Sequence, residues 1–417
     1  MYQVEAGASL RKALRMGVAP WRTGRVSRNV VVLGLTSLLT DVSAEMVATV
    51  LPIYVVLHLG LTPLYFGILD GLNNGATAVL RLVGGVIADR WGHYKEVALV
   101  GYCVSAICKL GLLVVGSAWT LILGIVAVDR AAKGLRVAPR DALISFSSRP
   151  GDLATSYGVH RTLDATGAML GPLIALAILA AAPNGFGMIF VSSFSVAVIG
   201  CAVLLFFVEN ARRDVEAVVS TQGTGGIRLL VDQPGFRGLV GVAAVLSVVT
   251  VSDGFIYLEL LQGLGTSAGI FPLFYVGTAG VYLLLAAPVG RLADRFGRRT
   301  MFVSGYFILA FAYLTALGSE GDWVGSALCL VLLGSYYAMT DGVLMALGSS
   351  ILPVHLRGTG LATLATATSL GRLVASLSFG GLWTAYGTDV PFLVFFVALL
   401  LAASISIVLL RRNSSDE

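Results

Sequence analysis

Charged side chains are scarce in this sequence: only 12% of its 417 residues are Asp, Glu, Lys or Arg, whereas 57% are hydrophobic. Soluble domains carry about 25% charged residues, so the composition excludes an ordinary soluble protein. The mean hydropathy of +0.87 indicates an integral membrane protein. A bilayer-spanning helix needs about 20 mostly apolar residues, and we expect twelve such helices. They begin near Val30, Leu64, Val97, Trp119, Ala154, Phe186, Gly238, Ala268, Thr300, Val324, Thr359 and Val390.

Cysteine and histidine are also rare, with four of each. The cysteines Cys103, Cys108, Cys201 and Cys329 all fall inside expected spans, and none has the spacing of a metal site. We interpret them as buried reduced thiols. The histidines are scattered, without the His-rich tract typical of metal handling. We therefore expect no resident metal and no cofactor.

Two signatures of chemical catalysis are missing from the sequence. No G-x-x-x-x-G-K-[ST] phosphate-binding loop occurs, which disfavours a pump driven by ATP. No nucleophile-base arrangement stands out either. We therefore expect a protein that is not an enzyme.

Lys and Arg are confined to every second loop. Short loops rich in these residues stay in the cytoplasm, so both termini are expected there, in a multi-pass protein of the cell's inner (plasma) membrane. The intervening loops near Gly60, Asn184 and Gly265 contain neither residue. This topology explains the net charge of +5 and gives no reason to invoke nucleic acid. No secretory signal is expected, because the basic N-terminal arm runs directly into a full-length span.

The chain contains an internal repeat. The segment GGVIADRWGHYK at 84–95 recurs as VGRLADRFGRRT at 289–300. We therefore expect an all-α membrane protein of two related halves, as in many transporters, whose substrate site lies between the repeats. The expected parts are a cytoplasmic basic arm (1–28), a six-helix bundle (29–209), a cytoplasmic connector (210–235), a second six-helix bundle (236–412) and a cytoplasmic tail (413–417).

The repeated element resembles the loop between the second and third helices of the major facilitator superfamily, G-x-x-x-D-[RK]-x-G-[RK]-[RK]. The resemblance implies the major facilitator fold, with twelve transmembrane helices in two pseudo-symmetric bundles. Glycine permits a tight turn, and Asp beside Arg at a helix end can form a breakable ionic latch, so we interpret the element as a gating motif. His93 and Tyr94 replace the usual basic pair of the first copy, which indicates a weaker latch there. The matching residues are Gly85, Asp89, Arg90 and Gly92, and then Gly290, Asp294, Arg295, Gly297, Arg298 and Arg299.

The segment DRAAKGLRVAPRD, from Asp129 to Asp141, brings a cluster of charges into otherwise apolar sequence. Because an ionisable group at membrane depth costs at least about 2.5 kcal/mol, we expect it to face a protein interior or an aqueous cavity. Arg130 and Lys133 fall in a stretch that resembles the superfamily's R-x-x-Q-G element, and the resemblance implies proton handling or substrate contact for Arg130. The alternative is a bracing salt bridge to Asp129 or to a carboxylate of the first helix. Arg136, Arg140 and Asp141 are expected to form an ion network nearer the cytoplasm.

The first span carries two carboxylates, Asp41 and Glu45, one turn apart on one helix face. Like charges held close together in a poorly solvated site favour the uptake of a proton. We therefore expect one of them, with Asp41 preferred, to exchange the driving proton while Arg130 and Lys133 tune its affinity. The alternative is permanent pairing with Lys109, Arg130 or Lys133.

The fifth span contains Gly167, Gly171 and Pro172, an arrangement that resembles the motif of exporter branches of the superfamily. Small residues four apart let two helices approach closely, and proline permits a kink. His160 lies toward the cytoplasmic end with Arg161 and Asp164; a proton relay and a purely structural histidine are both open for it.

The second half is poorer in charge, with Asp253, Glu259, Asp341 and Arg372 inside expected spans. Asp253 and Arg372 fall near the midplane, where they form a pair or one of them meets substrate. Aromatic residues such as Tyr257 line the cavity or pack between helices. The expected substrate cavity comprises Asp41, Lys109, Asp129, Arg130, Asp253, Tyr257 and Arg372.

These features together predict a monomeric secondary transporter that exports a small organic molecule in exchange for protons across the lipid bilayer. One alternative keeps the fold but makes the protein an importer or a metal-ion exporter that uses Asp41, Glu45, His160 and Asp164 as ligands. A further alternative is a membrane receptor or scaffold that does not transport, since fold does not determine function.

Overall fold

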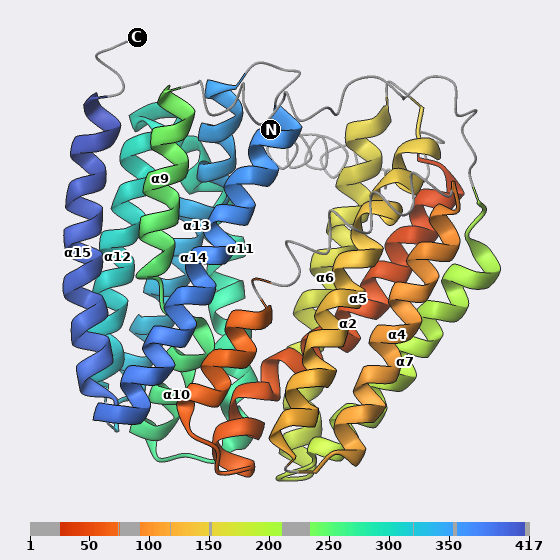
Figure 1. Ribbon diagram of the computed structural model, residues 1–417, viewed down its shortest axis with the longest axis horizontal. Coiled ribbons are helices and arrows are strands. Elements are labelled where there is room, and N and C mark those ends of the chain that lie inside the picture. The colour runs from red at the N-terminus through yellow and green to blue at the C-terminus, as the bar shows by residue number, and fades with distance from the viewer. Residues whose placement is uncertain are drawn as a thin grey trace. The chain divides into compact units, whose positions relative to one another are not determined.

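The computed structural model describes residues 26–73, 75, 92–116, 118–149, 152–210, 234–319, 321–352 and 357–412. These residues are almost entirely helical and contain no strand, which confirms the expected all-α fold class (Figure 1). Nine of their helical stretches are long and apolar enough to cross a bilayer. Helix α5 is not among the nine, because the charges from Asp129 to Asp141 interrupt its apolar sequence.

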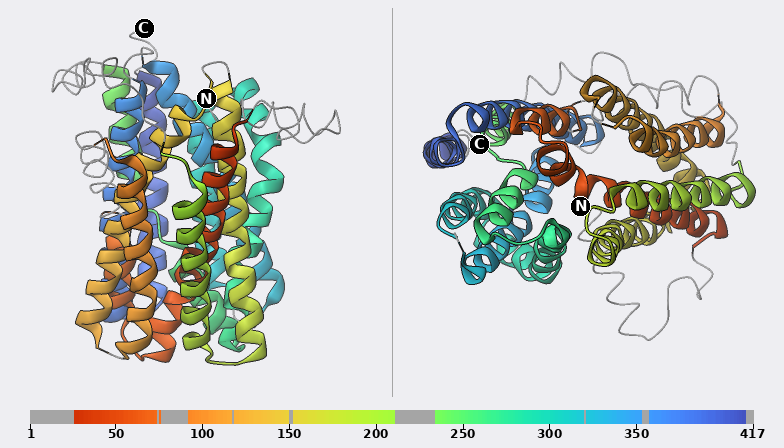
Figure 2. Two further views of the ribbon diagram at one scale, coloured as in Figure 1. Left: turned by 90° about the vertical axis from the view of Figure 1, so that its right-hand side faces the viewer. Right: turned by 90° about the horizontal axis from the view of Figure 1, so that it is seen from below.

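Contacts divide the chain into two compact units, and the first comprises Met1–Leu51 and Ala76–Val219. Its helices run side by side (Figure 2). Buried residues from all of them, among them Leu33, Tyr102, Leu143 and Leu204, form one apolar core. The helices are α2 (Arg28–Ile53), α4 (Tyr94–Val114), α5 (Trp119–Phe146), α6 (Leu153–Ala181) and α7 (Phe186–Phe207).

Glycine sets the closest helix approach in this unit. A Cβ atom at Gly167 of α6 would collide with the carbonyl oxygen of Leu38 on α2, and one at Gly171 would lie 2.8 Å from the carbonyl oxygen of Val42. The backbones of α6 and α2 therefore touch along the face that carries these glycines, as small residues four apart allow. Helix α6 continues through Pro172 without interruption.

The second unit comprises Pro52–Gly75 and Ser220–Glu417. Helix α13 packs on α11 and α12, α14 packs on α9, and α12 packs on α15. The helices are α9 (Pro234–Val248), α10 (Asp253–Leu264), α11 (Phe271–Phe296), α12 (Arg298–Leu317), α13 (Trp323–Ile351), α14 (Arg357–Tyr386) and α15 (Asp389–Arg412), with short π and 3-10 segments at Tyr54–His58 and Ala268–Ile270.

The segment Pro52–Gly75, which precedes most of the first half in sequence, groups with this second unit. Its Phe66 ring packs edge-on against Phe255 of α10, with ring centroids 4.8 Å apart. Asp70 accepts a hydrogen bond from Ser376 of α14, and Gly67 leaves no room for a Cβ against the Ser376 backbone. The segment Pro52–Gly75 thus packs with the C-terminal helices. The expected division of the chain into two halves at the connector stays a prediction.

The span expected to begin near Gly238 is not one continuous helix. Helix α9 ends at Val248, α10 begins at Asp253, and residues 249–252 are not helical. The break coincides with a run of β-branched residues, VVTV at 248–251, whose side chains are restricted in a helix. Tyr313 of α12 supports the freed backbone: its hydroxyl accepts from the Val251 amide at 2.8 Å and donates to the Val249 carbonyl at 3.3 Å.

Because the Tyr313 hydroxyl bridges two backbone groups, we expect its removal to destabilise the protein markedly. Tyr313→Phe removes only the hydroxyl, but it leaves a buried amide and a carbonyl without their partner. We expect the free energy of unfolding in detergent micelles to fall by about 1–3 kcal/mol. Tyr386→Phe is the matched control, because the Tyr386 side chain is exposed at the end of α14. Equal stability of the two variants would contradict a supporting role for Tyr313.

Candidate functional site

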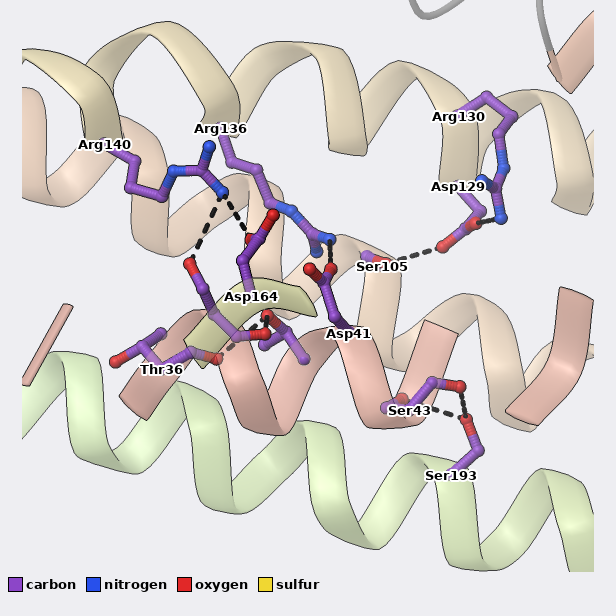
Figure 3. Close-up of polar contacts among 12 residues, drawn as sticks. Thr36, Asp41, Ser43, Ser105, Asp129, Arg130, Arg136, Arg140, Asp164 and Ser193 are labelled. Carbon is purple, nitrogen blue, oxygen red and sulfur yellow. Dashed lines mark hydrogen bonds and ion pairs between the residues drawn. The ribbon is translucent and has the colours of Figure 1, made fainter. Parts of the chain in front are cut away.

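The charged face of α5 holds two separate clusters, both within the first unit (Figure 3). The first surrounds Asp129. One carboxylate oxygen accepts from the Ser105 hydroxyl at 2.5 Å and lies 3.4 Å from the Lys109 ammonium, and the other lies 2.7 Å from the Arg130 guanidinium. Ser105 and Lys109 belong to α4, so this cluster ties α4 to α5. The structure thus shows the bracing arrangement for Arg130 through Asp129, and it does not pair Arg130 with Asp41 or Glu45.

The second cluster joins α2, α5 and α6. Arg136 of α5 is buried and lies 4.0 Å from the Asp41 carboxylate of α2. Arg140, one turn further along α5, lies 3.5 Å from Asp164 of α6 and 3.0 Å from Asp141. Both arginines thus reach the carboxylates of neighbouring helices, because residues four apart share a helix face. The ion network expected for Arg136, Arg140 and Asp141 therefore extends across three helices.

Asp41 and Asp164 also meet each other. Their carboxyl groups are close enough to interact electrostatically. An ionised carboxylate can only accept hydrogen bonds, so a bond between two carboxyl groups needs a proton on one of them. Three guanidinium groups reach this pair: Arg136 lies by Asp41, and Arg140 and the more exposed Arg161 each lie 3.5 Å from Asp164.

The buried His160 extends the same cluster. Its Nε2 lies 2.9 Å from the Ser37 hydroxyl, and that hydroxyl is 3.3 Å from a nitrogen of Arg140. The Ser37 hydroxyl accepts from Arg140, and it donates to Nε2 or accepts from it according to the tautomer of His160. His160 is therefore linked to Asp164 through Ser37 and Arg140.

Glu45 and Lys133 are not brought into either cluster. Neither side chain forms an ion pair or hydrogen bond with a residue that the structure describes. The carboxylate that faces Asp41 is Asp164 on another helix. The glycine pattern gave no signal for this pairing: Gly167 meets Leu38 and Gly171 meets Val42, so α6 and α2 run parallel, and this register does not place Asp164 opposite Asp41.

The expected cavity residues of the second unit differ in exposure. Tyr257 is fully buried, donates to Thr278 at 2.7 Å and stacks edge-on with Tyr275, so it packs α10 against α11 and does not line an open surface. Asp253 and Arg372 are partly exposed. They do not form an ion pair with each other; Asp253 instead accepts from the Tyr337 hydroxyl at 2.7 Å.

The gating motif is only partly within the described residues. Gly85, Asp89 and Arg90 of the first copy lie outside them, and Gly92 has a φ of +65° that glycine adopts readily. In the second copy, Asp294 near the end of α11 binds Arg298 at the start of α12 at 2.7 Å. Both side chains are exposed, so the contact can break at low cost. The remaining residues of that copy are Gly290, where an added Cβ would meet no atom within 4 Å, Arg295, which lies over the ring of Phe296, and Gly297, with a φ of +99°.

Within the described ranges, no three His, Cys, Asp or Glu side chains are arranged so that they could hold a metal ion. Asp41, Glu45, His160 and Asp164, the ligands of the metal-exporter alternative, are all in these ranges. The geometry of these residues therefore offers no support for that alternative.

Helices of membrane-spanning length with paired charges inside them define a multi-pass membrane transporter. The chain belongs to the Major Facilitator Superfamily, whose family model matches residues 33–280 and 239–417. An uncharacterized MFS-type transporter of Methanocaldococcus jannaschii is 30% identical over 370 residues, 86% of this chain and 89% of that protein. An uncharacterized protein of Mycobacterium tuberculosis is 26% identical over 297 residues, 70% of each chain.

Solved transporter structures share the fold at low sequence identity. The nucleoside transporter NupG superposes with a TM-score of 0.76 at 14% identity, over 92% of this chain and 99% of its own. A POT family transporter in complex with 5-aminolevulinic acid gives 0.76 at 13%, over 93% and 96%. A bacterial homolog of the human lysosomal transporter Spinster gives 0.71 at 15%, over 94% and 98%. These likenesses confirm the expected fold, and the family confirms a transporter that is not an enzyme.

Proposed function

We propose that the protein exports a small organic molecule from the cytoplasm in exchange for protons. The observation that carries this proposal is the carboxyl pair Asp41–Asp164, enclosed between three helices and flanked by Arg136 and Arg140. Ionisable groups inside a membrane protein are costly, and where they persist they mark ion and substrate paths. A pair that can share one proton is a suitable carrier for the coupling ion.

The proton would be exchanged by a change of partner within this cluster. With the proton bound, the two carboxyl groups hold each other through a hydrogen bond. Without it, they repel, and each is stabilised by its own guanidinium, Asp41 by Arg136 and Asp164 by Arg140. The 4.0 Å separation of Arg136 and Asp41 leaves room for a closer contact in the unprotonated state. Proton binding would thereby change how α2 is held against α5 and α6.

Two further features support export through the inner membrane. The close contact of α6 with α2 at Gly167 and Gly171 matches the packing role of the exporter-type motif. The distribution of Lys and Arg supports a topology with both termini in the cytoplasm. Export from that side would use the inward proton gradient.

The test is transport by the purified protein in liposomes that contain a pH-sensitive dye. The probes are radiolabelled N-acetylphenylalanine, uridine and dialanine, the last two because relatives of the fold include nucleoside and peptide transporters. We expect at least one probe to accumulate inside liposomes whose lumen is more acidic than the outside, with protons leaving as the probe enters. A protonophore, which collapses the pH gradient, should abolish this accumulation. Accumulation with proton flux in the same direction would indicate an importer. Binding without flux of any probe would indicate a receptor and contradict the proposal.

A further inference from the structure

Arg372 of α14 differs from the charged groups of the α5 clusters. Lys109, Arg130, Arg136 and Arg140 each have a carboxylate within 4.0 Å. Arg372 has no such partner and forms no hydrogen bond with any residue in the described part of the chain. Its side chain is only partly buried. Ionisable groups in membrane-spanning segments almost always face the protein interior or water, so we expect the accessible part of Arg372 to face water or a ligand within the protein.

The immediate surroundings of Arg372 are tyrosines from two other helices. Tyr306 of α12 and Tyr336 and Tyr337 of α13 are close enough to Arg372 to interact with it electrostatically. Their rings form a continuous cluster, with centroids 5.4 Å apart for Tyr306 and Tyr336 and 5.0 Å for Tyr336 and Tyr337. Tyr306 and Tyr336 are buried, whereas Tyr337 is partly exposed. Arg372 and Tyr337 are therefore the partly exposed members of this group.

Two acidic groups lie further from Arg372. Asp253 acts on it only at long range, because its carboxylate is bonded to Tyr337 and is not within ion-pair distance of Arg372. Asp341 of α13 is exposed and also acts at a distance. These carboxylates offset the charge of Arg372, but neither of them, nor any other group among the described residues, accepts a hydrogen bond from its guanidinium. They would also repel a dianion such as a phosphate monoester more strongly than a monoanion.

We propose that Arg372 binds the carboxylate of the transported molecule, whose apolar body packs on Tyr336 and Tyr337. The planar guanidinium matches a carboxylate through two parallel hydrogen bonds. The cargo is thus a monocarboxylate with an apolar or aromatic body. This inference rests on the proposed transport function and specifies its substrate class.

The test measures equilibrium binding to the full-length protein in detergent, with no proton gradient. N-acetylglycine, N-acetylleucine and N-acetylphenylalanine are each compared with their neutral amides by thermal shift and isothermal titration. We expect at least one acid to bind about tenfold or more tightly than its amide, with affinity rising with the size of the apolar body. Arg372→Gln should remove this preference and Arg372→Lys should keep part of it. Arg237→Gln, which removes an exposed arginine at the start of α9, should behave as wild type.

Several results would overturn the inference. These are an amide that binds as tightly as its acid in all three pairs, an unchanged preference in a monodisperse Arg372→Gln variant, and tighter binding of the cation phenylalaninamide than of N-acetylphenylalanine. Because no proton gradient is applied, loss of this preference and loss of proton coupling are measured independently. If Arg372 proves not to bind a carboxylate, the export proposal is still decided by the transport assay in liposomes. If the transport assay contradicts export, the binding measurement still decides the role of Arg372.

Discussion

Replacing Asp41 by Asn abolishes proton-driven accumulation while substrate exchange across the membrane continues. The variant cannot share a proton with Asp164, and it has no carboxylate charge for Arg136 to stabilise after proton release. We expect accumulation against a pH gradient to fall at least about tenfold, because an amide side chain neither takes up nor releases the coupling proton. The measurement is proton flux recorded together with N-acetylphenylalanine flux in liposomes, followed by counterflow without a gradient.

Asp164→Asn should give the same uncoupled behaviour, because it removes the other half of the pair. Glu45→Gln is the matched control: it neutralises a carboxylate on the same helix that contacts neither cluster within the described residues. Full coupling in Asp41→Asn and Asp164→Asn, together with lost coupling in Glu45→Gln, would transfer the proton site to Glu45. Unchanged coupling in all three variants would place the carboxylates of α2 and α6 in a purely structural network.

Adding side chains at Gly167 destabilises the protein strongly. Even a methyl group there would collide with the backbone of Leu38, and backbone cannot move aside as a flexible side chain can. We expect Gly167→Ala to lower the free energy of unfolding by about 1–3 kcal/mol and Gly167→Leu to lower it further, as overpacking does. The measurement is the unfolding midpoint in mixed micelles, with monodispersity checked by size exclusion.

Gly124 of α5 is the matched control, because a Cβ atom there would meet no atom within 4 Å. Gly124→Ala should leave stability unchanged or raise it by up to about 1 kcal/mol through helix propensity. Similar losses at Gly124 and Gly167 would show that any helix glycine is intolerant, and the close approach of α6 to α2 would then not be the cause.

Local patterns predicted the fold well because each span is a self-contained signal. Helix α5 begins at Trp119 and α7 at Phe186, the positions expected from the apolar runs, and α12 begins within two residues of Thr300. In a bilayer every backbone group must be satisfied within its own segment, so composition along the chain is enough to identify a helix. The repeat of the Gly-Asp-Arg element then identified the family.

The break between α9 and α10 was not predicted, although the β-branched run marked it. Such a run lowers helix propensity only slightly, and many membrane helices tolerate it. The break persists because Tyr313, more than sixty residues away in sequence, bonds to the exposed backbone. A local pattern cannot reveal a partner on another helix.

The sequence by itself determined that this protein is a helical membrane transporter with costly charges on α2 and α5, because hydropathy, charge and repeats are written along one chain. Only the tertiary structure decided which charges meet. It brought Asp41 near Asp164, paired Arg130 with Asp129, and left Arg372 without a carboxylate partner among the described residues. These pairings depend on how helices are rotated and packed against each other, and that rotation is set by side-chain contacts such as those of Gly167 and Gly171, which involve residues far apart in sequence.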